Sequence, residues 1–229
     1  MKEKGTIFVV SAPSGSGKNS VMNAVMADCP NMRYSVSATT RSIRGNEVDG
    51  VNYYFVSEQR FDEMLANGEL LEYTGYIGRR YGTPEKPLRE MVAQGYDVVM
   101  DVDVVGGLAI KKKIPEAVLV FLAVPSMAEL RQRLIGRADV KPEEIDKRIA
   151  KAYEELPQAQ FYDYIVLNPT GKKELAVDEF KAIVTAEKYK AAVLRPAEAP
   201  VEALAAAEKC KTVERFHLIK EELSCSTPQ

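Results

Sequence analysis

Ser-Ala-Pro-Ser-Gly-Ser-Gly-Lys-Asn-Ser, residues 11–20, is the stretch of sequence that decides the fold of this chain. An apolar and β-branched run precedes it at residues 6–10, and a helix-like spacing of apolar residues follows it. A strand, a glycine-rich turn and a helix N-terminus direct several backbone N–H groups and the positive end of a helix dipole at one point. Gly15 and Gly17 allow the backbone to approach phosphate oxygens closely, and Lys18 adds a mobile cation. The stretch therefore predicts a phosphate-binding loop for ATP, with these expected ligands: Pro13, Ser14, Gly15, Ser16, Gly17, Lys18, Asn19 and Ser20.

Two positions depart from the usual phosphate-loop pattern. Ala12 stands where the first glycine is usual, and Asn19 stands where a Ser or Thr hydroxyl normally helps to hold Mg²⁺. An amide oxygen can ligate Mg²⁺, although it is longer and less compact than a hydroxyl, so we expect a shifted or water-bound metal at Asn19. A flexible surface loop can carry the same Gly-Ser-Gly-Lys letters, but it would lack the apolar strand before them and the helix after them.

The size, charge and composition of the chain narrow the classes of function. Its 229 residues are enough for one α/β domain with insertions. The formal net charge of -2 gives no global basic field for nucleic acid. No apolar run approaches the roughly 18 residues of a membrane span, and the charged start does not resemble a signal peptide. Three cysteines without a CxxC pair fit reduced thiols, so we expect a cytoplasmic protein.

The single histidine, His217, lies near the C-terminus and far in sequence from every other motif. Nucleophilic catalysis by a Ser-His or Cys-His pair and histidine-based metal sites are therefore not expected. The chemistry has to depend on Lys, Arg and Asp side chains and on the backbone.

Short apolar runs alternate with helical patterns, which predicts an α/β fold with a P-loop NTPase-type parallel sheet and flanking helices. Unbroken apolar runs in two of the strands are typical of strands buried on both faces. Ser126 with Glu129 predicts a capping box, and Thr83 before Pro84 predicts a helix N-cap. The expected strands are residues 6–11, 34–37, 97–102, 117–124 and 164–167.

The pattern changes in three places, which gives the expected domain organisation. Short aromatic strands around a helix at 57–67 predict a small α+β insertion at 41–82, within a core formed by 1–40 and 83–193. A polar stretch flanked by arginines, about 136–148, suits a mobile lid. Residues 194–229 are expected to form a linker and one amphipathic helix, roughly 201–223, and they leave open a homo-oligomer formed through this segment.

Several separate motifs in this order resemble the guanylate kinases, a family of nucleoside-monophosphate kinases. The resemblance covers about residues 5–189 and implies the reaction ATP + GMP → ADP + GDP with Mg²⁺, with dGMP as a second acceptor. The motifs are the phosphate loop, Ser37-Ala-Thr-Thr-Arg41 with Arg44, Glu47, Gly50 and Tyr53, Glu72 followed by Tyr81-Gly82-Thr83, Asp101-Val-Asp103, the series Arg133, Arg137 and Arg148, and Asn168.

Such a reaction needs no general base, because the attacking phosphate oxygen is already anionic. It needs cations around two phosphates that repel one another. Arg41 and Arg44 lie three residues apart and converge if the stretch turns, and Tyr53 and Tyr81 add O–H donors. The resemblance implies that these four positions bind the GMP phosphate. A solvated arginine face and tyrosines packed in the core remain the alternatives.

A carboxylate suits guanine, since it accepts two parallel hydrogen bonds from N1–H and N2–H₂, and adenine has no N1–H. Glu72 fits this part, and the resemblance directs the hydroxyls of Ser37 and Thr83 toward O6. Asp101 and Asp103 follow a buried strand, where ligands of open α/β sheets collect. The resemblance implies that Asp101 serves Mg²⁺ and Asp103 serves GMP, while two acids of a simple turn remain the alternative.

Arg133 and Arg137 fall on one helical face at i, i+4 beside the expected lid. The functional interpretation is that lid closure brings Arg137 and Arg148 onto the transferring group, that Arg133 contacts ATP phosphates, and that Arg148 also reaches GMP. Asn168 would face adenine. The alternatives are a solvated helix with ion pairs and an asparagine in a turn. The residues expected to take part in catalysis are Lys18, Arg44, Arg137 and Arg148.

Two other functions compete with this interpretation. A guanylate-kinase-like binding module with weakened catalysis would typically have lost the phosphate loop, yet Gly15, Gly17 and Lys18 are present. A related kinase for another small molecule would not need Glu72 together with Ser37 and Thr83. A panel of acceptor nucleotides distinguishes them.

Overall fold

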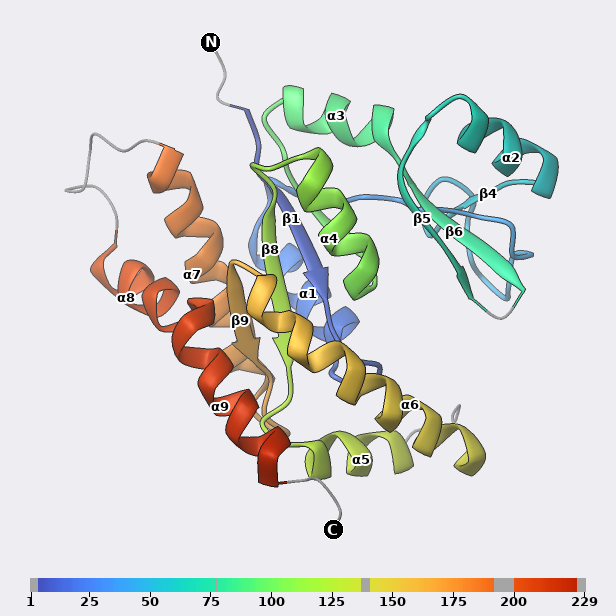
Figure 1. The fold of residues 1–229 in the computed structure, drawn as a ribbon. Coiled ribbons are helices and arrows are strands. Elements are labelled where there is room, and N and C mark those ends of the chain that lie inside the picture. Colours follow the sequence, from blue (N-terminus) through green and yellow to red (C-terminus); the bar gives the residue numbers. More distant parts are fainter. Residues whose placement is uncertain (1–3, 77, 137–140, 192–199, 226–229) are drawn as a thin grey trace. The chain divides into compact units, whose positions relative to one another are not determined.

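The computed structural model describes residues 4–76, 78–136, 141–191 and 200–225 (Figure 1). The chain divides into two compact units, the first comprising Met1–Val9 and Asn31–Ala117 and the second Val10–Pro30 and Val118–Gln229. Strand β1 (Ile7–Ser11) contributes residues to both. The five-stranded sheet has the order β2-β7-β1-β8-β9, and its pairs β2·β7 and β8·β9 are parallel, as expected for this α/β class.

The first unit contains the apolar strand β7 (Asp97–Asp101), whose first four residues are buried. It pairs with β2 (Met32–Tyr34), which begins and ends earlier than the strand expected at 34–37. Helix α3 (Glu85–Ala93) precedes β7 along the chain, and α4 (Val104–Lys113) follows it. The carboxyl end of β7 and the start of α4 therefore fall at the point where ligands of open α/β sheets collect.

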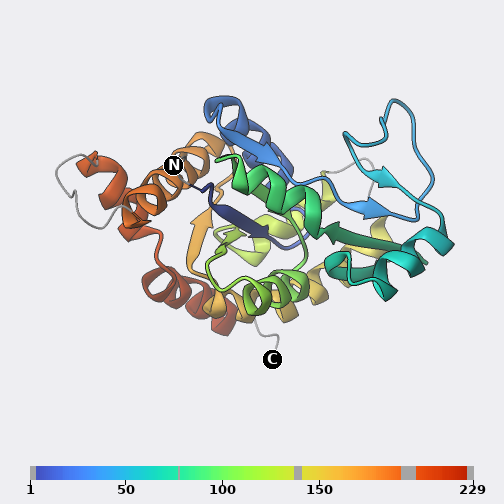
Figure 2. The same cartoon turned by 90° about the horizontal axis from the view of Figure 1, so that it is seen from above.

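The first unit contains a second sheet, in the order β4-β3-β6-β5, which extends beyond the 41–82 bounds of the expected insertion at both ends. Helix α2 (Glu58–Ala66) begins after Ser57, whose hydroxyl accepts the N–H of Arg60, and it packs on one face of this sheet (Figures 1 and 2). Alternation along the strands leaves the opposite face for polar side chains. The small core beneath α2 is formed by Ala38, Phe61, Met64 and Leu70. The strands are β3 (Ala38–Thr39), β4 (Tyr54–Phe55), β5 (Leu70–Tyr76) and β6 (Arg79–Pro84).

The second unit is built around β8 (Val118–Ala123), which is buried along its whole length, and β9 (Tyr164–Leu167). Ser126 is confirmed as the N-cap of α5, because its hydroxyl accepts the N–H of Glu129. The reciprocal half of the predicted capping box is not observed among the described residues, since the Glu129 carboxylate accepts from Arg133 and Thr170. The helices around these strands are α1 (Lys18–Asp28), α5 (Met127–Ile135), α6 (Pro142–Glu155), the 3₁₀ turn η1 (Leu156–Phe161) and α7 (Lys173–Ala191).

The C-terminal segment forms two helices, α8 (Val201–Lys209) and α9 (Thr212–Cys225), so the expectation of one helix over 201–223 is wrong. The break has a physical reason at Cys210 and Lys211. The Cys210 carbonyl accepts the N–H of Ile165 at 2.8 Å, and Lys211 forms an antiparallel bridge with Tyr164. A short extended piece thus adds to the edge of β9, and α8 packs on α7 (Figure 1).

Within the described part of the chain, every helix is too short or too polar to cross a bilayer.

Candidate functional site

A cavity of about 170 Å³ in the first unit, here called the Glu72 pocket, lies at the carboxyl end of β7 and on the polar face of the second sheet. Five of the residues expected to bind GMP line it, as does Asp101. The structure therefore brings together side chains that are up to 66 positions apart in sequence, Ser37 and Asp103. The lining consists of Tyr34, Ser37, Tyr53, Glu72, Thr74, Tyr81, Gly82, Asp101, Val102 and Asp103.

Glu72 presents a mostly buried carboxylate to this pocket. Its burial raises the pKa, the Asp103 carboxylate adds to the rise, and the Thr83 hydroxyl and Lys113 oppose it. Thr83 donates to Oε1 of Glu72 at 2.6 Å. Gly106 lies close to the other oxygen, since a Cβ at that position would be 3.0 Å from Oε2. The carboxylate is therefore held in one orientation before any ligand arrives.

Thr83 does not cap α3, so that prediction is wrong. It belongs to β6, and the N-cap of the helix is Pro84, which places the first helical residue at Glu85. The hydroxyl of Thr83 is bonded to Glu72 instead. Thr83 is still part of the strand, one residue before the N-cap, and its buried hydroxyl forms a charge-assisted bond with the carboxylate.

Arg41 is a nearly buried cation, with 7% of its surface exposed. It forms a bidentate ion pair with Glu47, in which both N–O distances are 2.7 Å. Its hydrogen bonds with Arg41 lower the pKa of Glu47 to about 2, and the same bonds raise the pKa of Arg41. The guanidinium lies over the rings of Tyr53 and Phe55, at 5.1 and 5.5 Å from their centroids. Arg41 is thus fixed in position next to a side chain that lines the pocket.

Arg44 is exposed, and within the described ranges its guanidinium makes no recorded ion pair or side-chain hydrogen bond. Its backbone N–H donates to Glu47 at 2.9 Å, which ties the turn between the two arginines. The chain thus turns between the two arginines, as expected, while a convergence of their cationic side chains stays a prediction.

Asp101 is the last residue of β7 and Asp103 follows the strand, and the two carboxylates have different contacts. Asp103 is the N-cap of α4, and its Oδ1 accepts the N–H of Gly106 at 2.7 Å. The sequence interpretation did not anticipate this cap, and any contact of Asp103 with GMP stays a prediction. Burial raises the pKa of Tyr34 and of Tyr53, and the charge of Asp101 adds to both rises. Both phenols therefore remain protonated donors at neutral pH.

The phosphate loop of the second unit has the geometry that its glycines predict. Gly15 and Gly17 have φ angles of +98° and +86°, in the left-handed region that other residues avoid. A Cβ at Gly17 would stand 2.6 Å from Nδ2 of Asn168. The sequence predicts helical spacing from Val21 onward, and helix α1 already starts at Lys18, after the N-cap Gly17. The N-terminus of a helix is a typical binding site for a phosphate group, because its N–H groups and its dipole favour an anion.

Arg133 and Asn168 brace this loop from behind. Nδ2 of Asn168 donates to the Ser16 carbonyl at 2.7 Å, and Nη1 of Arg133 donates to the same oxygen at 3.2 Å. The Arg133 guanidinium also bonds Glu129 and the Asn168 carbonyl. These N–H groups donate to other groups of the protein and hold the loop in place. The expected contacts of the two side chains with ATP phosphates and adenine stay predictions.

Arg148, from α6, donates to Oγ of Ser14 at 2.9 Å and to Glu144 at 3.0 Å. It is therefore an arginine that reaches the phosphate loop from another element. Arg137 and the following residues to 140 lie outside the described residues, whereas 142–148 of the expected lid belong to α6.

The two expected metal ligands belong to different units: Asn19 is exposed in the first turn of α1, and Asp101 lies in the Glu72 pocket. The part of the chain that the structure describes holds no group of three His, Cys, Asp or Glu residues able to bind a metal. An amide and a carboxylate oxygen suit Mg²⁺, which keeps several waters and binds few protein groups. Each of the two residues therefore offers an oxygen of a type that Mg²⁺ binds, and their binding of one ion together stays a prediction.

A family model described as guanylate kinase matches residues 4–187, which is most of the chain. The protein belongs to the guanylate kinase family. Curated guanylate kinases of Halalkalibacterium halodurans and Carboxydothermus hydrogenoformans are 47% and 45% identical to it, each over 82% of this chain and over 92% and 91% of their own lengths. A solved guanylate kinase from Anaplasma phagocytophilum superposes with a TM-score of 0.64 at 29% identity, over 86% of this chain and 96% of the other.

Within this guanylate kinase fold, the sequence interpretation missed Tyr34 and Thr74, which also line the Glu72 pocket. Thr74 could have been found, because it lies two residues after Glu72 on β5 and so faces the same side of the sheet. Tyr34 had no such signal, since its strand was expected to begin where it in fact ends.

Proposed function

We propose that this protein transfers the γ-phosphoryl group of ATP to GMP, and to dGMP, giving ADP and the nucleoside diphosphate. The observation that carries the proposal is the Glu72 pocket, in which Thr83 orients a mostly buried carboxylate and whose lining residue Tyr53 is in contact with the nearly buried cation Arg41. Membership of the guanylate kinase family supports it. Nothing observed favours the binding module or the kinase of another small molecule.

Guanine selection follows from the charge and orientation of Glu72. Its carboxylate can accept N1–H and N2–H₂ together. Because the Thr83 hydroxyl donates its one proton to Glu72, the Ser37 hydroxyl in the same pocket is the group left to donate to O6, and Thr83 can donate there only by releasing Glu72. Adenine offers no N1–H donor. A bound AMP would leave the buried carboxylate without its hydrogen-bond donors, so kcat/KM for AMP should be lower than that for GMP by a large factor.

The acceptor phosphate is expected to meet Arg41, Arg44, Tyr53 and Tyr81. Arg41 is pre-oriented by Glu47, while the exposed Arg44 is the cation that moves. The hydroxyls of Tyr53 and Tyr81 are neutral donors, which limits the charge that must be desolvated. The arginines position and neutralise the phosphate, and no proton has to be removed from it.

The phosphate loop is expected to bind ATP through backbone N–H groups, Lys18 and the N-terminus of α1. Mg²⁺ would be held by Asn19 and Asp101 and supplies charge neutralisation when it is bound. We assign Arg137 and Arg148 to the transferring group, with Arg148 already bonded to the loop through Ser14. The lid at about 136–148, the GMP-binding insertion at 41–82, the core at 1–40 and 83–193 and the cytoplasmic location without nucleic-acid or membrane partners belong to the same proposal.

The test measures ADP release by the purified full chain with Mg²⁺ and ATP, in the presence of GMP, dGMP, AMP or no acceptor. We expect turnover with GMP and dGMP, a kcat/KM for AMP lower by about 10³-fold or more, and only slow hydrolysis without an acceptor. A folded protein that binds ATP but forms no GDP would overturn the proposal. Asn19→Ser restores the usual hydroxyl and should raise kcat; a fall in kcat would contradict the assignment of Asn19 to the metal.

A further inference from the structure

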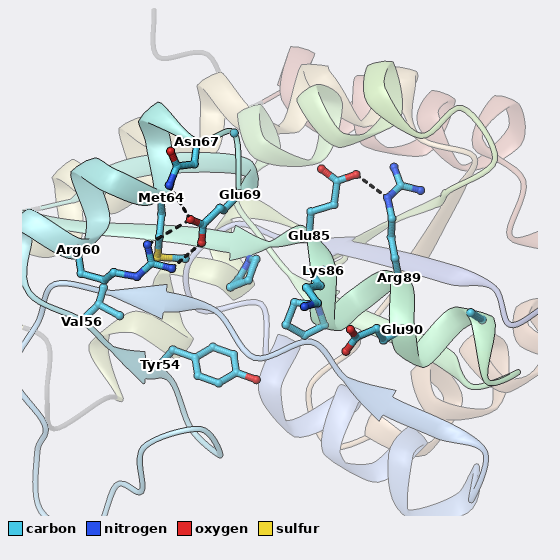
Figure 3. A pocket seen from close by; sticks show the side chains of 14 residues that line it. Tyr54, Val56, Arg60, Met64, Asn67, Glu69, Glu85, Lys86, Arg89 and Glu90 are labelled. Carbon is cyan, nitrogen blue, oxygen red and sulfur yellow. Dashed lines mark hydrogen bonds and ion pairs between the residues drawn. The ribbon is translucent and has the colours of Figure 1, made fainter.

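A second and larger cavity of the first unit lies on the α2 side of the four-stranded sheet and has a volume of about 820 Å³. We call it the Tyr54 pocket (Figure 3). It is formed by β4, by α2 and the turn after it, and by α3. Its apolar surface comes from Tyr54, Val56, Met64, Pro84, Pro87 and Ala93. The volume lies within the range of small-molecule sites, about 300–1,000 Å³.

The charges around the Tyr54 pocket balance one another. Arg60 is bonded to both oxygens of Glu69 at 3.1 and 2.6 Å, and Arg89 is paired with Glu85, as the dashed lines in Figure 3 show. Lys86 and Glu90 carry one charge of each sign, and neither has a recorded side-chain partner within the described ranges. A phosphate-bearing or otherwise charged ligand would meet an equal number of like charges, so the rim favours a neutral molecule.

The polar groups still available to a ligand are few. The hydroxyl of Tyr54 is recorded with no hydrogen bond among the described residues, and in Figure 3 it points toward the side of the pocket where Glu90 lies. Lys86 can donate and Glu90 can accept at the same end. An apolar cavity with a small number of polar groups at one edge is the usual form of a site for an aromatic molecule that carries one or two hydrogen-bonding atoms.

We propose that the Tyr54 pocket binds a neutral aromatic small molecule and is thermodynamically linked to the Glu72 pocket. The two pockets lie on opposite faces of one sheet, and residues adjacent in sequence contribute to both. Tyr53 lines the Glu72 pocket and Tyr54 lines the other, and Thr83 bonds Glu72 whereas Pro84 lines the Tyr54 pocket. A ligand that fixes Tyr54 and Pro84 therefore also restricts Tyr53 and Thr83, and linkage requires the effect to be reciprocal.

The binding experiment uses N-phenyl-1-naphthylamine, a neutral aromatic probe with one N–H donor whose fluorescence rises in apolar sites. Titration of the full chain should show saturable binding to one site. Ala93→Trp places an indole on the exposed part of the pocket wall and should weaken the probe at least tenfold. Gln94→Trp, one residue further and outside the lining, is the matched control and should change its Kd by less than twofold. Because the chain has no other tryptophan, the emission of each variant also reports its folding.

The linkage experiment repeats the titration with saturating GMP and measures GMP binding with and without the probe. We expect the two Kd values to shift at least threefold and by the same factor, with the Kd of ATP unchanged. Binding that Ala93→Trp does not weaken, or no saturable binding at all, would overturn the site, and binding without a reciprocal shift would overturn the linkage. The first arm needs neither GMP nor turnover, so its failure is distinct from failure of the proposed kinase activity.

Discussion

Glu72 is the residue whose replacement separates guanine recognition from the rest of the protein. Glu72→Gln keeps the size of the side chain and an oxygen for Thr83, but it loses the charge and one of the two acceptors for guanine. We expect kcat/KM for GMP to fall about 100-fold, since hydrogen bonds to a charged group contribute about 1.5–3 kcal/mol each, while the KM for ATP stays within twofold. Steady-state kinetics with each substrate varied measure this.

The control for this change is Glu63→Gln, an exposed glutamate of α2 in the same unit, which should leave both constants unchanged. An equal loss for GMP and ATP in Glu72→Gln would point to misfolding rather than recognition. The free Glu72→Gln protein should also melt at a higher temperature at neutral pH, because a carboxylate held charged in a buried site is removed.

The pH dependence of GMP use follows from the raised pKa of Glu72. Burial is the largest cause of the rise, so the carboxylate takes up a proton at a higher pH than the ordinary glutamate value of about 4.3. As the pH falls through the raised value, kcat/KM for GMP should decrease. GMP has a phosphate that titrates near pH 6, and the decrease due to Glu72 is therefore the part that is absent in Glu72→Gln.

If the acid limb of the GMP profile were identical in the wild type and Glu72→Gln, Glu72 would not be the group that recognises guanine.

The pH dependence of stability has the opposite sign to that of GMP use. A carboxyl group whose pKa is raised by folding binds its proton more tightly in the folded state, so its contribution to stability is present below the unfolded pKa and is lost as the pH rises through the folded pKa.

At the scale of elements, the phosphate loop depends on a brace that joins the end of β9 to the loop. Asn168→Leu removes the donor to the Ser16 carbonyl but keeps a similar volume, and Arg133 is left as the remaining recorded donor to that oxygen. We expect the free energy of unfolding to fall by about 1–3 kcal/mol and the KM for ATP to rise, because a buried polar group loses a partner. The KM for GMP should stay unchanged, since the Glu72 pocket belongs to the other unit.

Urea denaturation and kinetics with varied ATP give the two readouts. A variant that loses stability without any change in the KM for ATP would show that the brace does not set the geometry of the loop. A direct adenine contact of Asn168 predicts the reverse, a higher KM for ATP with the stability of the wild type.

The origin of this brace shows how far sequence reasoning reaches. The loop, its glycines and the start of α1 were predictable, because strand, turn and helix are contiguous along the chain. Glu72 was predictable from its chemistry and its order among the motifs. The contacts of Ser16 with Arg133 and Asn168 join residues 117 and 152 positions apart, and no local pattern contains such a pairing. Thr83 was assigned to a helix cap from its local sequence, because its actual partner lies on the neighbouring strand of the sheet.

At the scale of the whole molecule, the C-terminal helices extend a chain whose family match ends at residue 187. They are part of the folded second unit. Ala207, Cys210 and Ile219 are buried, and Arg215 pairs with Glu179 of α7 at 2.7 Å. Composition predicted helical content here, but the break at Cys210 depends on the free edge of β9, which only the fold reveals.

Removal of residues 192–229 should therefore destabilise the protein rather than trim a passive tail. The truncation exposes the edge of β9 and the apolar surface of α7, and edges of this kind favour association between chains. We expect a loss of about 3 kcal/mol or more in the free energy of unfolding and a concentration-dependent increase in size by light scattering. The full chain should show neither change, and its size also tests the expected self-association through this segment.

A point substitution settles the matter if the truncated chain does not fold. Ile219→Ser, at a side chain that is 6% exposed, should lower the free energy of unfolding by about 2 kcal/mol, because it removes buried apolar surface and adds a hydroxyl. Leu218→Ser, at the adjacent position with 55% exposure, should change it by less than about 0.5 kcal/mol. Equal effects at the two positions, measured by urea denaturation, would mean that α9 does not pack on the rest of the second unit in solution. A difference confined to Ile219 requires that one face of α9 is buried, and the stability of the kinase then depends on a segment that lies beyond the match to its family.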